Sequence, residues 1–541
     1  MSLARTTNAA TRVGTTVRPA VQSTWRSRAF LTWIAPDLAL TFALVTLFSV
    51  FFMFHGATAL FSDTDTGWHI RNGERIIATG RLPRSDLYSF SRPGQPWIAW
   101  EWGADVLMGA VYGVSGLGGI ALIYGLCIAA SVWMWFRLNR AASGNFLIGC
   151  LLFVPMLSTT QLHWLARPHI FSWLFLLGTV WLCERIPSHL GWRHFTLIVI
   201  VAAAWANLHG SFFFAPLIAL IYAAGVALGP WIWEGPGTDI GKTGGTRTLE
   251  PGGSSIRIYV LIAFAASAGT LVNPYGWRLH QHVFSYLFDS GMLNQITEFQ
   301  SFNFHQEGAM FVMAMLAFCF AGAFAALADH KPGRFLLSIL LTGIGLRSVR
   351  ALPVAALLLL PLANGSISAV LSRAAGLAPW LRLHLDDWME YGNRLQAIER
   401  DFRGYAIIPL AAIVIFASIR YSAGFSASDA PLGASTEVAS LSPDARILAS
   451  DSFGGYLIYR FDGVRKVFFD GRSDFYGKDF VERYMRLVEA RPGWLDEFNR
   501  WNFTHALLPP DCPLIPALEA KGWQEIYRDR TAVLLTGGPT L

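Results

Sequence analysis

The sequence predicts a polytopic α-helical membrane protein in which many spans precede a small water-soluble α/β domain. Of its 541 residues, 53% are hydrophobic and 14% are charged, and the mean hydropathy is +0.40, whereas soluble domains carry about 25% charged residues. The charge is also uneven, because 29 of the 121 residues from position 421 onward are charged, against 49 of the first 420. This composition excludes a soluble enzyme, a disordered scaffold and a disulfide-framed secreted module. The net charge of +6 reflects arginines in loops, so no nucleic-acid partner is expected.

The first 33 residues form a basic leader. This segment is rich in Arg and Thr and lacks an adjacent short apolar region with a cleavage site, so it is not a secretory signal. The positive-inside rule places it in the cytoplasm because of five arginines: Arg5, Arg12, Arg18, Arg26 and Arg28.

The membrane domain is expected to cover residues 34–420. Apolar runs long enough to cross a bilayer, allowing for tilt, occur at about eleven places. The approximate spans are 34–55, 118–136, 145–161, 169–184, 195–207, 211–229, 257–272, 309–328, 334–346, 351–363 and 404–420.

Alternation of these spans puts most basic loops inside, as the charge rule requires. The Gly-rich stretch 234–255 is predicted to be a flexible inside loop. Residues 56–117, here called the first outer loop, face outward although they contain five arginines. Long loops are exempt from the rule, so the layout stands.

The C-terminal domain (421–541) is expected outside the cytoplasm, because an odd number of spans carries the chain across. Short apolar or alternating runs predict strands, and two longer patterns predict helices: strands near 445–450, 456–461, 466–472, 505–510 and 531–537, and helices near 478–490 and 513–522. The polar turn at Asp470 and Arg472 either contacts an acceptor or is only a salt-bridged turn.

Unusual polar residues collect on the predicted outward face. Ionisable groups at a membrane boundary are costly, so their gathering on one side indicates a site. They are Asp63, Asp65, His69 and Glu101 in the first outer loop, then His163, Arg167 and His169, then Asn207 and His209, then Asn273 and Glu298, and finally Arg347 and Arg350.

This mixture of side chains suits chemistry on a phosphorylated ligand. The planar fork of arginine matches phosphate oxygens, and the Asp63-Thr-Asp65 pair can hold a divalent cation or supply a base. Ordinary roles stay open for each: an isolated D-x-D is commonly a turn or helix cap, and Arg347 and Arg350 can snorkel at a helix end.

The first outer loop contains an ordered pattern of residues that leads into the next membrane helix. An Asp, aromatic residues, a His and an Arg are followed by a Pro…Asp…Pro-Gly…Trp stretch. These residues are Asp65, Trp68, His69, Arg71, Pro83, Asp86, Pro93, Gly94 and Trp97. The pattern resembles the first extracytoplasmic loop of the GT-C class of membrane glycosyltransferases, above all that of the oligosaccharyltransferase catalytic subunit and its archaeal relatives.

The resemblance implies transfer of a sugar from a polyprenyl-phosphate or polyprenyl-diphosphate carrier to an acceptor outside the membrane, usually with inversion. It implies that Asp65 is the base or a metal ligand, with Asp63 and Glu101 as further catalytic carboxylates. The other expected roles are donor-phosphate binding by Arg347, Arg350, Arg167, His163, His169 and His209, acceptor binding by Glu298, Tyr456, Asp470 and Arg472, and metal binding by Asp63, Asp65 and His69.

The sequence departs from this family in two ways. The acidic pair of the second outer loop is replaced by HWLARPH (163–169), so the cofactor is either a divalent cation (Mg, Mn or Zn) or none. The acceptor motif WWDYG is absent, which favours a lipid or polysaccharide acceptor over a protein. The Arg-rich style of the sequence indicates a bacterial inner membrane, with the C-terminal domain periplasmic or extracellular.

Three other functions compete with this one. A transporter or flippase also needs many helices and buried charges, but it usually places the charges near mid-membrane and shows internal repeats, which this sequence lacks. A polymerase or ligase of lipid-linked glycans would share the carrier substrate. A non-enzymatic assembly factor would not need the outward-facing carboxylates and arginines.

Overall fold

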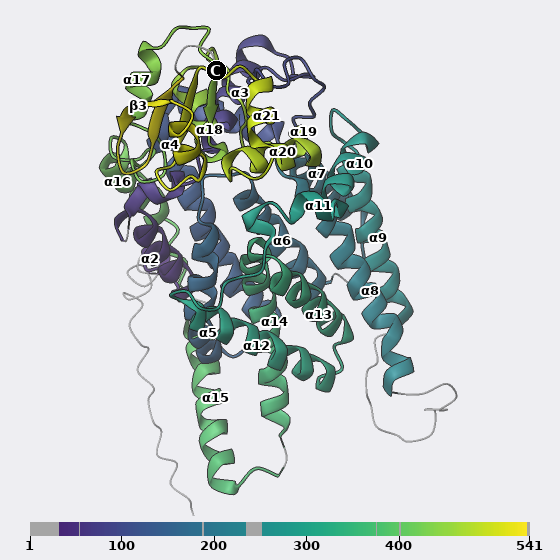
Figure 1. Ribbon diagram of the computed structural model, residues 1–541. Helices are drawn as coiled ribbons and strands as arrows, with labels where there is room; N and C mark the ends of the chain where they lie inside the picture. The colour runs from purple at the N-terminus through teal and green to yellow at the C-terminus, as the bar shows by residue number, and fades with distance from the viewer. Residues whose placement is uncertain are drawn as a thin grey trace, which may run out of the picture.

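The computed structural model describes residues 32–53, 55–186, 189–233, 252–374, 376–399 and 402–537. The leader at 1–33 and the loop at 234–255 lie almost wholly outside the described residues. The described chain forms a long helical bundle capped at one end by the first outer loop and the C-terminal domain, while α15 (Pro379–Glu399) extends beyond the other end (Figure 1).

Each of the eleven predicted spans overlaps a helix. The helices are α2 (Leu38–Phe52), α4 (Trp102–Ala141), α5 (Phe146–Thr160), α6 (His169–Glu184), α7 (Trp192–Leu208), α8 (Phe214–Trp233), α9 (Gly252–Thr270), α12 (Ala309–Ala328), α13 (Pro332–Arg347), α14 (Leu352–Arg373) and α16 (Ile407–Ile419). Within the described residues, five helical stretches are long and apolar enough to cross a membrane: 102–141, 146–163, 210–233, 309–328 and 349–373. The multi-pass character is therefore supported, and the number of eleven spans and their orientation stay predictions.

Helix α4 starts well before the predicted span at 118–136. It runs for 40 residues and bends at Gly116, whose φ of 62° is reserved for glycine in practice. Helix α10 (Trp277–Phe288), the short α11 (Ser290–Leu293) and α15 were not predicted.

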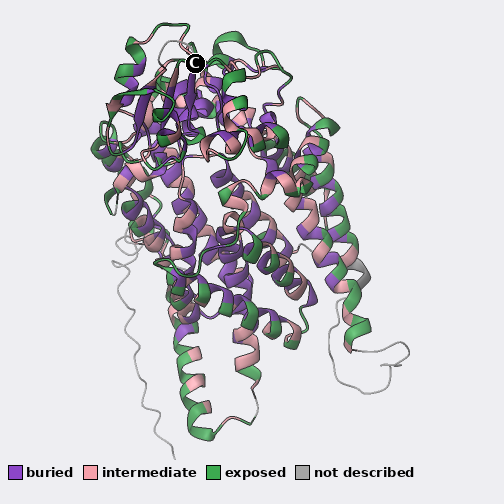
Figure 2. Ribbon diagram, in the orientation of Figure 1, coloured by how far each residue is buried: buried purple, intermediate pink, exposed green. Residues whose placement is uncertain are grey.

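The outer faces of the bundle are apolar. Leu151 of α5, Phe264 of α9 and Phe324 of α12 are each more than 60% exposed, as expected of side chains that contact lipid. Figure 2 shows the complementary pattern, with buried residues along the middle of the bundle. Small residues allow close packing inside: a Cβ added to Gly225 of α8 would lie 2.3 Å from the backbone nitrogen of Gly333 in α13.

A buried ion pair ties the helices together at the end away from the first outer loop. Arg334 Nη2 lies 2.6 Å from Glu184 Oε2, and Arg334 Nη1 donates to Ser366. The hydroxyl of Tyr222 donates to Glu184 at 2.6 Å. Both charges are paired and hydrogen-bonded, as buried charges must be in an apolar bundle.

The C-terminal domain contains a four-stranded sheet of order β1-β2-β4-β3. Strand β1 (Ile447–Ala449) is parallel to β2 (His505–Leu508), whereas β2 with β4 (Val533–Thr536) and β4 with β3 (Gln524–Arg528) are antiparallel. Its helices are α17 (Ala434–Ser440), α18 (Asp451–Arg460), α19 (Ser473–Tyr476), α20 (Lys478–Val488), α21 (Trp494–Arg500) and α22 (Leu514–Glu519).

Two of the predicted strands are wrong, and one strand was missed. Residues 456–461 belong mostly to helix α18, because a short apolar run cannot by itself distinguish a buried helix from a strand. Residues 466–472 form no strand, and only Val467 makes an isolated bridge, with Ser89 of the first outer loop. Strand β3 was not predicted, because it is largely exposed and its sequence is mostly polar.

The first outer loop and the C-terminal domain share one hydrophobic core. Trp68, Tyr88 and Trp97 of the loop pack with Phe468 and other apolar side chains of the domain. Backbone bonds join the two segments, since Phe90 N–H donates to the Val467 carbonyl and Val467 N–H donates to that of Tyr88. The loop therefore holds its shape through residues almost 400 positions away.

Candidate functional site

The centre of the site is the turn between the short 3-10 segment η2 (Gly56–Phe61) and α3 (Thr66–Thr79). Asp63 Oδ1 accepts a hydrogen bond from the Asp65 backbone N–H at 2.9 Å. Asp65 stands at the N-cap of α3, yet its carboxylate accepts no capping hydrogen bond. The simple capping role thus fits Asp63 in part and does not describe Asp65.

Arg167 brings both aspartates together. Its Nη1 lies 2.5 Å from Asp63 Oδ2, and its Nη2 lies 3.1 Å from Asp65 Oδ2. The same Nη1 is 3.4 Å from Oε1 of Glu298, which belongs to the short helical segment Thr297–Phe299. Arg350 approaches Glu298 from the other side at 3.1 Å. We call these five residues the ionic cluster.

The C-terminal domain closes over Asp65 through two glycines. A Cβ added to Gly471 would lie 2.1 Å from Asp65 Oδ1, and one added to Gly455 would lie 2.3 Å from the carbonyl oxygen of Thr64. A larger residue at Gly455 would displace the turn, and one at Gly471 would displace the Asp65 carboxylate. The domain therefore forms one wall of the site.

A second polar group lies beside the cluster and is centred on Glu101. Its Oε2 is 3.8 Å from His69 Nε2, and its Oε1 is 3.6 Å from His209 Nε2. The far ring nitrogen of His69 bonds Asp105 at 2.6 Å, and that of His209 lies 2.9 Å from the Ser172 hydroxyl. Each imidazole is thus oriented by a partner on its far side.

Burial divides the carboxylates into two kinds. It raises the pKa of Asp65 from 3.8 to about 8, an effect that Asp63 reinforces and Arg167 opposes, and it raises the pKa of Glu101 to about 7. Burial also acts on Glu298, but Arg350 and Arg167 outweigh it and hold the pKa of that carboxylate at about 2. Burial lowers the pKa of His69 to about 4, so the ring is neutral at neutral pH. Asp65 and Glu101 are therefore suited to exchange protons, and Glu298 is suited to stay charged.

Buried polar atoms without a partner gather near the cluster. Within the described residues, both ring nitrogens of His163 and the indole nitrogens of Trp164 and Trp68 form no hydrogen bond. Buried groups of this kind are costly unless a ligand or water meets them. His169 differs, because its Nε2 lies 3.0 Å from the carbonyl oxygen of His163.

The structure brings many of the predicted site residues to one place. Those in or beside the cluster are Asp63, Asp65, Arg167, Glu298, Arg350, Glu101, His69, His209, His163 and His169. Arg347 is exposed at the end of α13 and forms no hydrogen bond or ion pair within the part of the chain that the structure describes. Arg350 lies three residues later, beyond the end of α13, and this change of backbone direction places Arg350 and not Arg347 in the site.

The residues predicted to bind the acceptor fall into two groups. Glu298 belongs to the ionic cluster, whereas Tyr456 is buried against Phe425. Arg472 is fully buried and pairs with Asp470 at 2.7 Å and with Asp86 of the first outer loop at 2.8 Å. Of the two roles predicted for Asp470 and Arg472, the salt-bridged turn describes these contacts. An acceptor role for these buried side chains stays a prediction without support.

The predicted metal ligands are not arranged as a set. His69 turns away from Asp63 and Asp65 toward Asp105 and Glu101, and both aspartates are bound by Arg167. Among the residues that the structure describes, no three His, Cys, Asp or Glu side chains converge as metal ligands would. In this arrangement the donor groups do not fit a divalent cation.

Several residues of the site were missed in the sequence. Asp105 lies one helical turn after Glu101 and could have been found from that spacing. Asn72, which donates to Asp105 at 2.6 Å, also lies one turn from His69. Ser172 and Gly471 have no local signal, because their importance depends on contacts with distant segments.

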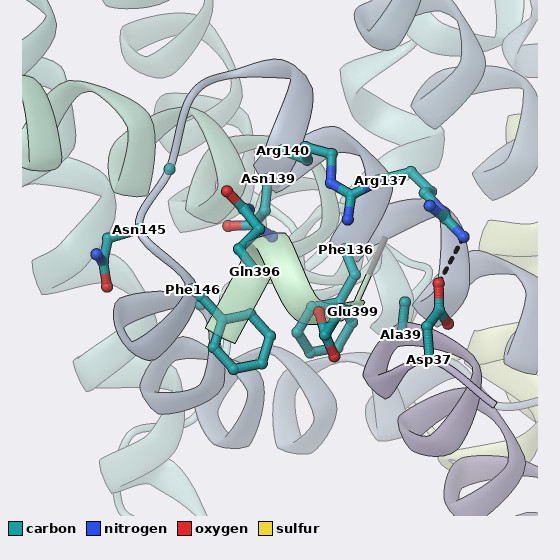
Figure 3. A pocket seen from close by; sticks show the side chains of 12 residues that line it. Asp37, Ala39, Phe136, Arg137, Asn139, Arg140, Asn145, Phe146, Gln396 and Glu399 are labelled. Carbon is teal, nitrogen blue, oxygen red and sulfur yellow. Dashed lines mark hydrogen bonds and ion pairs between the residues drawn. The ribbon is translucent and has the colours of Figure 1, made fainter. Parts of the chain in front are cut away.

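Two of the cavities formed by the described residues lie outside the ionic cluster. A small one of about 20 Å³ lies at the opposite end of the bundle, beside the Arg137–Asp37 ion pair and Glu399 (Figure 3). Such a volume holds about one water molecule, so it offers no room for a substrate. A much larger cavity of about 1230 Å³ lies between the first outer loop, the segment 274–282 and the C-terminal domain.

Comparisons with known proteins agree on the fold. No protein-family model and no curated protein matches the sequence. The structure is similar to the crystal structure of the Archaeoglobus fulgidus oligosaccharyltransferase in the apo form, with a TM-score of 0.52, 11% identity, and coverage of 90% of this chain and 70% of that one. It is equally similar to the same enzyme tethered by a disulfide bond to an acceptor peptide with the NVT sequon, with a TM-score of 0.52, 12% identity, and coverage of 90% and 69%. The chain therefore shares the fold of an archaeal oligosaccharyltransferase, a GT-C glycosyltransferase.

Proposed function

We propose that the protein is a membrane glycosyltransferase of the GT-C class. It moves a sugar from a polyprenyl-phosphate or polyprenyl-diphosphate carrier to a lipid or polysaccharide acceptor on the extracytoplasmic side. The observation that carries this proposal is the ionic cluster, in which three carboxylates and two guanidiniums meet at the end of the bundle beneath the C-terminal domain. The shared fold supports it.

In the proposed reaction, an acceptor hydroxyl attacks the anomeric carbon of the donor sugar. The bond from that carbon to the carrier phosphate breaks, and the phosphate leaves with the electron pair. Asp65 takes the hydroxyl proton, a role that suits a carboxylate whose pKa lies near the working pH. Arg350 and Arg167 supply the positive charge that stabilises the leaving phosphate.

In this proposal the Glu101 group is a second place where a proton can be held. A carboxylate between two neutral imidazoles can hold a proton without leaving a bare charge in the protein interior. His163, with two unpaired ring nitrogens beside the cluster, is the imidazole best placed to meet a phosphate oxygen.

The test is a transfer assay with purified protein in detergent and a panel of polyprenyl-phosphate sugars. Wild type is compared with Asp65→Asn and with Asp386→Asn, a control on exposed helix α15. We expect wild type and the control to release polyprenyl phosphate and Asp65→Asn to be at least about 100-fold slower. Full activity of Asp65→Asn would move the base to Glu101. Tight carrier binding without any release would favour the transporter instead.

A further inference from the structure

Arg167 occupies an unusual position among three acidic side chains. Its guanidinium lies within 3.4 Å of Asp63, Asp65 and Glu298, which come from two separate segments of the chain. Three carboxylates at one point repel one another strongly unless a cation sits among them. In proteins a divalent cation with oxygen ligands commonly fills such a place. Here the guanidinium fills it.

The backbone fixes Arg167 there. The Ala166 N–H donates to the carbonyl of Leu60 at 2.7 Å, and the Ala166 carbonyl accepts from the Thr66 hydroxyl at 3.0 Å. These two bonds attach the residue before Arg167 to both sides of the Asp63–Asp65 turn. Pro168 follows and restricts the chain further. The main chain from which the Arg167 side chain projects is thus fixed beside the turn that holds Asp63 and Asp65.

We propose that Arg167 is a built-in cation, which holds the place between the three carboxylates that a divalent metal would otherwise take. On this proposal, which rests on the proposed transferase function, transfer proceeds without a metal. Arg167 keeps Asp65 beside the acceptor and presents positive charge toward the donor phosphate, and Arg350 neutralises the remaining charge of Glu298.

The proposal is tested by metal binding, which does not require the enzyme to turn over. Wild type, Arg167→Ala, Arg167→Lys and the control Arg382→Ala are stripped with EDTA and titrated with Mn²⁺ under electron paramagnetic resonance. Wild type, the control and Arg167→Lys should bind no Mn²⁺ tightly. Arg167→Ala should bind one Mn²⁺, because removal of the guanidinium frees three carboxylates, and adding Asp65→Asn to it should abolish that binding.

Transfer activity gives a second reading. EDTA-treated wild type should transfer at its full rate, Arg167→Lys should be slowed, and Arg167→Ala should be slowed further. Tight Mn²⁺ binding by wild type, loss of its transfer with EDTA, or a folded Arg167→Ala protein that binds no Mn²⁺ would each overturn the proposal. Absence of transfer by wild type would reject the transferase function and leave the metal-binding result intact.

An independent observation concerns the cavity of about 1230 Å³. Three arginines, Arg81, Arg84 and Arg278, line it, and within the described residues none of their side chains forms an ion pair or a hydrogen bond. Its carboxylate, Asp474, is already held by His282 at 2.9 Å. Rings of Trp97 and Tyr275 form part of the lining. The cavity is therefore roomy, cationic and partly aromatic.

The same short segment of the C-terminal domain lines this cavity and contacts the ionic cluster. Asp474 follows only three residues after Gly471, which packs on the carboxylate of Asp65. Unpaired guanidinium forks bind carboxylates and phosphates, and aromatic faces are common in the lining of ligand sites.

We infer that the cavity holds the acceptor and that the acceptor is an anionic glycan. This inference rests on the proposed function, since a ligand is an acceptor only if the protein is a transferase. Its test, however, measures binding alone. Tetragalacturonate, an oligomer of glycerol phosphate and neutral cellotetraose are titrated into the detergent-solubilised protein by calorimetry. The first two distinguish carboxylate from phosphate as the charged group, and the third reports on neutral glycans.

We expect at least one anionic oligomer to bind at least 10-fold more tightly than cellotetraose. The double variant Arg84→Ala/Arg278→Ala should lose that advantage, whereas the control Arg382→Ala/Arg394→Ala on α15 should keep it. Equal binding of charged and neutral oligomers, or unchanged binding by the double variant, would overturn the inference. Binding of the anionic oligomer without transfer would retain the cavity site and reject the transferase function.

Discussion

Asp65 owes its chemical character to neighbours from distant parts of the chain. Arg167 binds its carboxylate at 3.1 Å, Asp63 supplies a nearby negative charge, and Gly471 covers one face with a bare Cα. The D-x-D pair is visible in the sequence, but the residues next to it do not reveal the contacts with Arg167 and Gly471. The raised pKa of this carboxyl group is the result of the fold, not of the motif.

The pKa of Asp65 predicts how transfer depends on pH. A base acts only when deprotonated, so with a pKa of about 8 the value of kcat/KM should rise with pH and level off above about 8. Rates measured between pH 6 and 9.5 will check this. Glu101→Gln should retain the rise near 8. If the rise disappears in Glu101→Gln, then Glu101 and not Asp65 is the base.

Gly471 offers a steric test of the same carboxylate. A methyl group at this position would lie 2.1 Å from Asp65 Oδ1, so Gly471→Ala must displace the carboxylate that we propose as the base. We expect transfer to fall about 100-fold, as misplacement by about 1 Å can cause, with the melting temperature little changed. Gly343→Ala serves as the control, because a Cβ there meets nothing within 4 Å. Equal rates for the two variants would contradict the packing described.

At the scale of elements, helices of the bundle were predictable and those of the site were less so. Each predicted span overlaps a helix because apolar length is a local property of the sequence. Residues 456–461 were predicted to be a strand but lie mostly in helix α18. Because this helix is buried on several sides, its sequence lacks the alternation of apolar and polar residues that marks a helix. Arg347 and Arg350 differ in fate because α13 ends between them, a boundary that spacing alone does not reveal.

The bundle predicts a strong dependence on the Glu184–Arg334 pair. Glu184→Gln leaves the buried guanidinium without a counter-charge, so we expect a loss of about 3–5 kcal/mol in stability. Thermal unfolding in detergent, compared at fixed detergent concentration, measures it. The matching change Glu390→Gln removes an exposed pair on α15 and should have almost no effect. Similar melting temperatures for both would show that the buried pair is dispensable.

At the scale of the whole molecule, the first outer loop and the C-terminal domain act as one unit. They share a core, exchange backbone hydrogen bonds at Val467, and are joined by Arg472 between Asp86 and Asp470. The sequence suggested two separate regions, because composition changes sharply near residue 421. Composition indicates whether a segment lies in lipid or in water, but it does not indicate which other segment it packs against. The shared core could therefore not be predicted from the sequence.

Removal of Arg472 should loosen this union. Arg472→Met leaves two buried carboxylates facing each other, so we expect faster proteolysis near residue 421 and loss of transfer. Limited trypsin digestion followed by mass spectrometry checks the first outcome. Arg528→Met, which removes an exposed pair in the same domain, should digest like wild type. Equal digestion of both variants would mean that Arg472 does not hold the loop to the domain.

The contact between Gly471 and Asp65 also sets an order of events during biosynthesis. Asp65 emerges from the ribosome about 400 residues before the glycine that covers it, and the whole bundle must be inserted in the interval. In a partly inserted chain, the turn with Asp63 and Asp65 is therefore present before the C-terminal domain that covers it. On the proposed function, the centre is complete only when the last domain has folded against this turn, so activity must follow the folding of the C-terminal domain.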